Sequence, residues 1–288
     1  MRSEETRKNQ WLLAALFAPV AHFSGCGWLA AGLTALAVLP LTLLPKRWEG
    51  MSRPAALVQI LWLGVAAGRF LGESAVYWPS DNDLAVPLTI LALALWAKTT
   101  GPRIGAVLAF CIALLSIPLA ASGASHLKPG WLAPRMGPWS PGLTAALLLP
   151  ALPVAGEDGK GKALTAGILT LASSALVQGV ISLPVAARAG DAFYQTARTL
   201  GYLEPVAAVA MTLGWFAVAL FLLGAAEKIG KNCAMGRAGA SVLAAGTAAG
   251  VLLWGRELSN GIFAVFCLFF WIIHPILRKN KKSAKNEK

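Results

Sequence analysis

Charged residues are scarce in this 288-residue sequence. They make up 13% of it, and 57% of the residues are hydrophobic. A typical soluble domain is about one quarter charged. The longest polar stretch inside the chain, 125–142, has no room for a folded soluble domain or a nucleotide-binding one. The composition therefore predicts a single integral membrane domain over residues 1–288.

Acidic residues are few as well, and none lies in the middle of an apolar stretch. Proton-driven carriers usually hold a carboxylate or histidine relay within the membrane. Here the candidates for such a relay are only His22 and His274, and each lies toward the end of an apolar segment. This pattern argues against proton coupling. It leaves sodium open, because backbone carbonyls and hydroxyls at a broken helix can bind that ion.

Reactive motifs are also missing. The four cysteines are far apart and have no metal-ligand spacing, so we expect them to pack between helices rather than form disulfides. There is no glycine-rich phosphate loop, no His/Glu cluster and no converging Ser/His/Asp set. We therefore expect no cofactor, no metal and no enzymatic activity. No cleavable signal peptide is evident either, because the second apolar stretch follows the first almost at once.

What the chain does contain is hydrophobic runs, separated by glycine, proline and charge. None alternates polar and apolar residues as barrel strands do, so all are predicted to be transmembrane helices. There are ten: 11–23, 28–44, 55–72, 84–97, 104–121, 143–154, 163–183, 205–223, 238–254 and 261–277.

Positive charge supports this count. If the N-terminus is cytoplasmic and the segments alternate, 19 of the 25 Lys and Arg residues fall inside and five outside, with Arg69 within a helix. Cytoplasmic loops are enriched in Lys and Arg. We therefore expect a multi-pass cell-membrane protein with both termini in the cytoplasm, its basic tail 278–288 lying next to anionic lipid and not on nucleic acid.

Two of the ten segments are too short to cross a membrane cleanly. Segment 11–23 contains Pro19, and segment 143–154 contains Pro150 and Pro153. As helices they would reach roughly 18–20 Å, against a hydrocarbon core of about 30 Å. They are first and sixth in order, and such a pair marks the central site of inverted-repeat transporters. We therefore expect an all-α, five-plus-five inverted-repeat bundle, with repeats at about 11–121 and 143–277.

The broken segments also suggest where a ligand binds. Pro19 removes a backbone donor and Gly25 relaxes the chain, so open amides and carbonyls near His22 and Ser24 could meet a small zwitterion. The alternative is that His22 simply lies at the membrane interface. Thr144 and Pro150 mark the partner segment. That segment either faces the same cavity or is a short helix in a locally thinned bilayer.

Other polar residues in apolar stretches have two readings each. Arg69 either pairs with Glu73 four residues later or holds a substrate carboxylate. Gln59 and Thr212 are predicted to hydrogen-bond between helices, with ligand contact as the alternative. The external loop 184–204 mixes aromatic and charged residues and is expected to lie along the outer surface, as a lid or as a passive connector.

Two stretches carry a family resemblance. One runs from Tyr77 to Pro134, where an external loop YWPSDNDLAVP leads into LTILALALWAKTTGPRIGAVLAFCIALLSIPL and then HLKPGWLAP. The other is GDAFYQTARTLGYLEPVAAVAMTLGWFAVALFLLGAAEKIG. In hydropathy and order the chain resembles the permease subunit of spore-germination nutrient receptors, a branch of the amino acid–polyamine–organocation transporters. Gly142-Leu143-Thr144 departs from the family, whose sixth helix usually begins with a Phe-Gly-Phe-Glu-like run, so no family ligand residue is carried over.

The resemblance implies a function. A permease-like protein of this family would recognise a small nutrient such as an amino acid, as a germination receptor subunit of the spore inner membrane or as a transporter. Its partners would be the lipid bilayer, the nutrient and further receptor subunits. The alternative is a degenerate permease that binds no ligand and serves as a membrane scaffold for partner subunits.

Overall fold

The described part of this computed structural model is entirely helical. It comprises residues 53–78, 82–97, 194, 197–198, 201–232 and 236–254. The elements are α3 (Arg53–Gly72), the 3₁₀ helix η1 (Glu73–Tyr77), α4 (Ala85–Ala97), α9 (Glu204–Asn232) and α10 (Arg237–Trp254). They correspond to the predicted third, fourth, eighth and ninth apolar segments. The predicted first and sixth segments lie outside the described residues.

Proline marks the start of three of these helices. Pro54, Pro87 and Pro205 each lie in a first turn, where the missing N–H would have no intrahelical partner anyway. Before α4, the Asn82 Oδ1 atom accepts a hydrogen bond from the Leu84 backbone N–H at 3.1 Å, the role of an N-terminal cap. The helix starts are thus set by local chemistry that the sequence already contains.

Helix α9 extends beyond its predicted apolar segment. The prediction ended at residue 223, but the helix continues to Asn232 and includes Glu227, Lys228 and Lys231. Glu227, which lies beyond the predicted apolar segment, is therefore helical. Alanine, glutamate and lysine favour helix, and charge ends an apolar run without ending the backbone pattern. At 29 residues α9 is about 43 Å long, more than the hydrocarbon core requires.

Two spans in this part of the chain are long and apolar enough to cross a membrane. They are Arg53–Tyr77, with 25 residues, and Glu204–Lys231, with 28. Helices α4 and α10 are apolar but shorter. Several large apolar side chains of these two shorter helices are exposed, among them Trp96, Val242 and Trp254.

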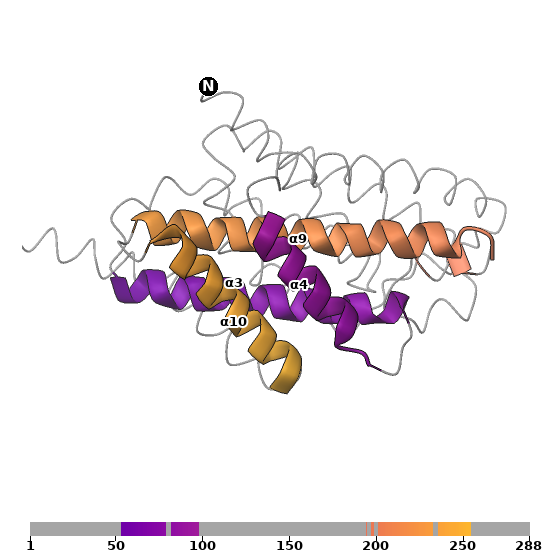
Figure 1. Ribbon diagram of the computed structural model, residues 1–288, viewed down its shortest axis with the longest axis horizontal. Coiled ribbons are helices and arrows are strands. Elements are labelled where there is room, and N and C mark those ends of the chain that lie inside the picture. The colour runs from indigo at the N-terminus through magenta and orange to yellow at the C-terminus, as the bar shows by residue number, and fades with distance from the viewer. Residues whose placement is uncertain are drawn as a thin grey trace, which may run out of the picture.

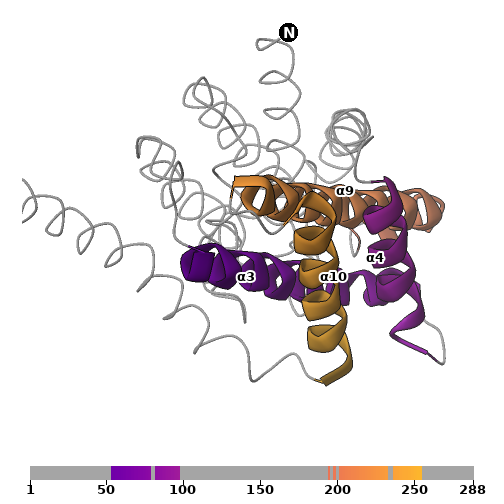
Figure 2. The same ribbon diagram turned by 60° about the vertical axis from the view of Figure 1, so that its left-hand side comes forward.

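Helices α3 and α9 lie side by side, and α4 and α10 run across them (Figures 1 and 2). Phe70 near the end of α3 stacks on Trp215, in the first half of α9. Trp78, farther along the chain, reaches Thr212, which is nearer the start of α9, so the two long helices are antiparallel. Gly64 and Gly68 of α3 meet Ala244 and Ala248 of α10 in the same order, so these two helices run in the same direction.

The contact between α3 and α10 depends on glycine. A Cβ atom on Gly64 would lie 2.5 Å from the Ala244 carbonyl oxygen, and one on Gly68 would lie 2.5 Å from that of Ala248. No side chain larger than hydrogen fits at either position without a shift. Small residues four apart let helix backbones approach closely in membrane proteins, where lipid leaves little hydrophobic drive for helix association.

The start of α10 packs against the end of α9. Gly236, directly before α10, has a φ of +76°, which glycine adopts without steric cost. A Cβ atom added to Gly230 would clash with the Cβ atom of Ala240, so the end of α9 lies directly on the first turns of α10.

Charge is sorted between the two ends of this bundle. One end, here called the basic end, holds the first residue of α3 and the neighbouring ends of α9 and α10. Its charged residues are Arg53, Glu227, Lys228, Lys231 and Arg237. The opposite end holds η1, the start of α4 and the start of α9. Its charged residues are Arg69, Glu73, Asp83, Arg198 and Glu204.

Candidate functional site

An aromatic cluster joins α3 and η1 to α9 at the end opposite the basic end. Its members are Phe70, Tyr77, Trp78, Tyr194 and Trp215. The Phe70 and Trp215 rings stack with centroids 5.8 Å apart and planes at 16°. Tyr77 meets Tyr194 edge to face, at 5.0 Å and 78°. Offset stacks and edge-to-face pairs are the geometries that aromatic quadrupoles favour.

Two indoles link η1 and α9 in opposite directions. The Trp215 Nε1 atom of α9 donates to the Tyr77 hydroxyl at 3.3 Å, and Trp78 Nε1 donates to the Thr212 hydroxyl of α9 at 2.7 Å. Thr212 in turn donates to the Ala208 carbonyl of its own helix at 2.7 Å. The predicted role of Thr212 in hydrogen bonding between elements is confirmed. These bonds hold the end of α3 against α9 where buried polar groups need partners.

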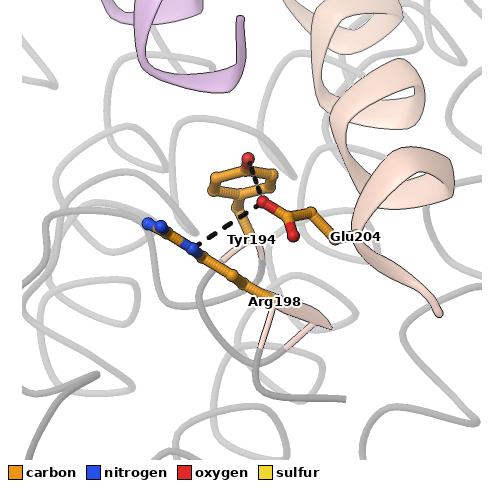
Figure 3. A network of polar contacts seen from close by, with 3 residues as sticks. All are labelled: Tyr194, Arg198 and Glu204. Carbon is orange, nitrogen blue, oxygen red and sulfur yellow. Dashed lines mark hydrogen bonds and ion pairs between the residues drawn. The ribbon is translucent and has the colours of Figure 1, made fainter. Parts of the chain in front are cut away.

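The carboxylate of Glu204 gathers two side chains from the residues that precede α9 (Figure 3). Its Oε1 atom accepts a hydrogen bond from the Tyr194 hydroxyl at 2.9 Å. The Nε atom of Arg198 lies 3.7 Å from the same oxygen. We call these three residues the clasp. Glu204 is the first residue of α9, where the helix dipole favours negative charge.

Arg69, a predicted ligand residue, lies in the last turn of α3, where the helix dipole favours positive charge. It is half-buried, as is Glu73. One residue corresponds to about 100° of helix rotation, so Arg69 lies off the face through which Phe70 reaches α9. The α-helix ends at Gly72 and Glu73 begins the 3₁₀ turn. Pairing of Arg69 with Glu73 and contact with a substrate both stay predictions.

Gln59 is buried within α3, with 4% of its surface exposed. Eleven residues separate it from Phe70, close to three full helical turns, so it lies on the face of α3 that meets α9. Its Oε1 atom accepts no hydrogen bond within the part of the chain that the structure describes. A buried amide oxygen without a donor costs free energy. Among the described residues, the hydrogen bond between helices expected of Gln59 is not formed through its Oε1 atom.

The other predicted ligand residues are Pro19, His22, Ser24, Gly25, Thr144 and Pro150. All six lie outside the described residues.

Sequence reasoning had placed Tyr194, Arg198 and Glu204 in one external loop but had not brought them to Tyr77 or Trp215. One signal was available. The chain has only three tyrosines, and two of them, Tyr77 and Tyr194, meet in this cluster. Trp215 and Tyr77 lie 138 positions apart in the sequence, so no local pattern predicts their hydrogen bond.

The described residues offer groups suited to binding. They contain no group of three His, Cys, Asp or Glu side chains placed to hold a metal ion. They do provide a carboxylate, phenol and indole groups, a guanidinium and a buried amide. Such groups bind and orient polar solutes through hydrogen bonds and charge.

The sequence matches no protein-family model and no curated protein.

Proposed function

We propose that this chain is a permease-like membrane protein of two inverted repeats that recognises a small polar nutrient such as an amino acid. One observation carries the proposal. In the predicted order, α3 and α4 are the third and fourth segments of the first repeat, and α9 and α10 are the third and fourth of the second. These four helices pack together as one unit.

Their directions fit an axis in the membrane plane. Such an axis exchanges α3 with α9 and α4 with α10, and it requires each pair to run in opposite directions. The Phe70–Trp215 and Trp78–Thr212 contacts make α3 and α9 antiparallel. Helix α4 begins near η1, whereas α10 begins at the basic end, so this pair also runs oppositely. The same axis would superpose the α3–α10 pair on the α9–α4 pair. The helices of both pairs are in contact.

Charge supports an orientation for this unit. The basic end carries Arg53, Lys228, Lys231 and Arg237, and positive charge is typical of the cytoplasmic side. The aromatic cluster and the clasp would then face outward. Exposed aromatic rings at this end, Trp78 and Tyr202, suit the headgroup level of a bilayer.

Polar groups on α3 support recognition of a polar solute. Gln59 and Arg69 lie within a span otherwise rich in apolar residues, and ionisable residues inside membrane spans commonly mark ligand pathways. The class of nutrient rests on the resemblance to germination receptor permease subunits. The proposed ligand contacts near Pro19–Gly25 and Thr144–Pro150 rest on the broken-segment pattern.

A thermal-shift screen of the purified protein against amino acids and nucleosides tests this function. For any ligand found, Ser24→Trp and Thr144→Trp should each weaken binding at least tenfold, which corresponds to about 1.4 kcal/mol. The exposed residue Lys228 at the basic end offers a control, and Lys228→Gln should leave the affinity unchanged. Absence of any ligand across a broad screen would contradict a nutrient-binding role.

A second candidate is the scaffold without a ligand. Helix α10 has a second small-residue face, opposite the one that packs on α3. There a Cβ atom added to Gly239 or Gly246 would meet no described residue within 4 Å. A partner helix could pack on such a face. Under this reading the screen finds no ligand, and Gly246→Leu disrupts co-purification with partner subunits while the isolated chain keeps its stability.

A further inference from the structure

Tyr194 is buried, as is Ala197, whereas Arg198 and Tyr202 face solvent. The Tyr194 side chain is 5% exposed. Its ring meets Tyr77 of η1 edge to face, and its hydroxyl reaches Glu204 of α9. Figure 3 shows the Tyr194 hydroxyl and the Arg198 side chain both reaching the same oxygen of the Glu204 carboxylate. One side chain therefore connects the residues before α9 to both η1 and α9.

The two contacts to Glu204 differ in strength. The Tyr194 hydrogen bond is 2.9 Å long and half-buried. The Arg198 ion pair is 3.7 Å long, and its side chains are 63% and 38% exposed. Exposed ion pairs of this kind contribute little to stability. A short hydrogen bond to a carboxylate contributes more. The hydroxyl of Tyr194, rather than the guanidinium of Arg198, holds the clasp closed.

Tyr77, which the Tyr194 ring meets edge to face, is part of a buried polar region of η1. The Tyr77 hydroxyl accepts from Trp215 Nε1 at 3.3 Å, a long hydrogen bond. Ser74, one 3₁₀ turn before Tyr77, has no exposed surface. Water could hydrate these groups if the ring moved away, so exposing them carries a smaller penalty than exposing an apolar core.

The chain between Arg198 and Glu204 contains a turn suited to act as a hinge. Gly201 has a φ of +67°, and a Cβ atom there would meet none of the described residues within 4 Å. The turn is held by two backbone hydrogen bonds, from Gly201 N–H to the Arg198 carbonyl and from Glu204 N–H to the Gly201 carbonyl. A turn with open surroundings can change its angle without repacking the helices.

We propose that Tyr194 is a removable closure over the aromatic-cluster end of the bundle, latched by its hydrogen bond to Glu204. Displacement of Tyr194 admits water to Ser74 and to the Tyr77–Trp215 pair. The inference rests on the proposed function only in taking this end as the outer one. Breaking the Tyr194 hydroxyl contact opens the closure, and removing the Arg198 charge does not.

Cysteine accessibility at Ser74 tests the closure. The variant Ser74→Cys is made in a chain whose four native cysteines are replaced by alanine, reconstituted in sealed vesicles. A small charged thiol reagent is applied from either side and the labelling rate is measured. We expect slow labelling in the parent, about tenfold faster labelling with Tyr194→Phe, and a larger increase with Tyr194→Ala. With Arg198→Gln the rate should change less than twofold.

Ser241 provides the matched control. It is fully buried like Ser74 but lies in the first turns of α10, at the basic end. Its labelling as Ser241→Cys should be the same with or without Tyr194→Phe. Unchanged labelling of Ser74→Cys in both Tyr194 variants would overturn the closure. Equal effects of Tyr194→Phe and Arg198→Gln on the labelling rate would contradict the role of the Tyr194 hydroxyl as the latch. Faster labelling at both Ser74→Cys and Ser241→Cys would show a general loosening of the bundle and would overturn the closure.

The side of labelling separates the two proposals. Faster labelling of Ser74→Cys from the outside in the Tyr194 variants supports both the closure and the orientation. Faster labelling from the cytoplasmic side alone supports the closure and contradicts the orientation in the proposed function.

Discussion

Trp215 donates its indole N–H to the hydroxyl of Tyr77 across 3.3 Å, although 138 residues separate them in the chain. The same indole ring stacks on Phe70. One side chain of α9 thus contacts both the last turns of α3 and the 3₁₀ helix that follows. This relationship sets how far α3 and α9 overlap, and the aromatic cluster and the clasp are built around it.

A double-mutant cycle can measure this contact. Trp215→Phe keeps an aromatic ring on Phe70 but removes the donor, and Tyr77→Phe removes the acceptor. Each should lower the free energy of unfolding by about 0.5–1.5 kcal/mol, and the double variant should lose less than the two losses combined. Unfolding in detergent, followed by circular dichroism, provides the measurement. Trp78→Phe with Tyr77→Phe serves as the control pair, because Trp78 donates to Thr212 instead, and additive losses are expected.

The α3–α10 interface should not tolerate a methyl group at Gly64. The added Cβ would lie 2.5 Å from a backbone oxygen and 2.6 Å from the Thr247 Cβ atom. We expect Gly64→Ala to lower the free energy of unfolding by about 1–3 kcal/mol. Gly246→Ala is the control, because nothing lies within 4 Å of the new carbon. It should leave stability unchanged or raise it by up to about 1 kcal/mol through helix propensity. Equal effects of the two variants in thermal unfolding would argue against close packing.

Gln59→Leu should stabilise the protein. It replaces a buried amide, whose Oε1 atom accepts no hydrogen bond among the described residues, with an apolar side chain of similar size. An increase in the free energy of unfolding of about 1–3 kcal/mol is expected. Thr212→Val should have the opposite sign, because that hydroxyl makes two hydrogen bonds at 2.7 Å. A loss of stability in Gln59→Leu would show that the amide oxygen has a donor in the intact protein.

The predicted topology can be checked by labelling sealed cells. In a chain without native cysteines, Ser80→Cys and Ser140→Cys should react with a membrane-impermeant reagent from outside, because few Lys and Arg residues fall on that side. Ser283→Cys, within the basic tail, should react only after the cells are opened. Reaction of Ser283→Cys in sealed cells would place the tail outside and refute the arrangement of ten crossings.

Local chemistry determined much of this protein in advance. Apolar runs separated by glycine, proline and charge predicted α3, α4 and α10 to within about two residues at each end. The same runs failed at the end of α9, because an apolar pattern stops at the first charges whereas a helix continues through Ala, Glu and Lys. The predicted ligand residues near Pro19 and Thr144 lie outside the described residues and stay predictions.

Only the tertiary structure decided which faces meet. The sequence shows Gly64 and Gly68 four residues apart, but not that they meet Ala244 and Ala248 of α10. It shows Tyr77, Tyr194 and Trp215, but not that they form one cluster. Helix positions follow from interactions within a few residues, which a single segment contains. Contacts between helices depend on the shapes of both partners and on how far one slides along the other, so they arise only when the whole bundle packs.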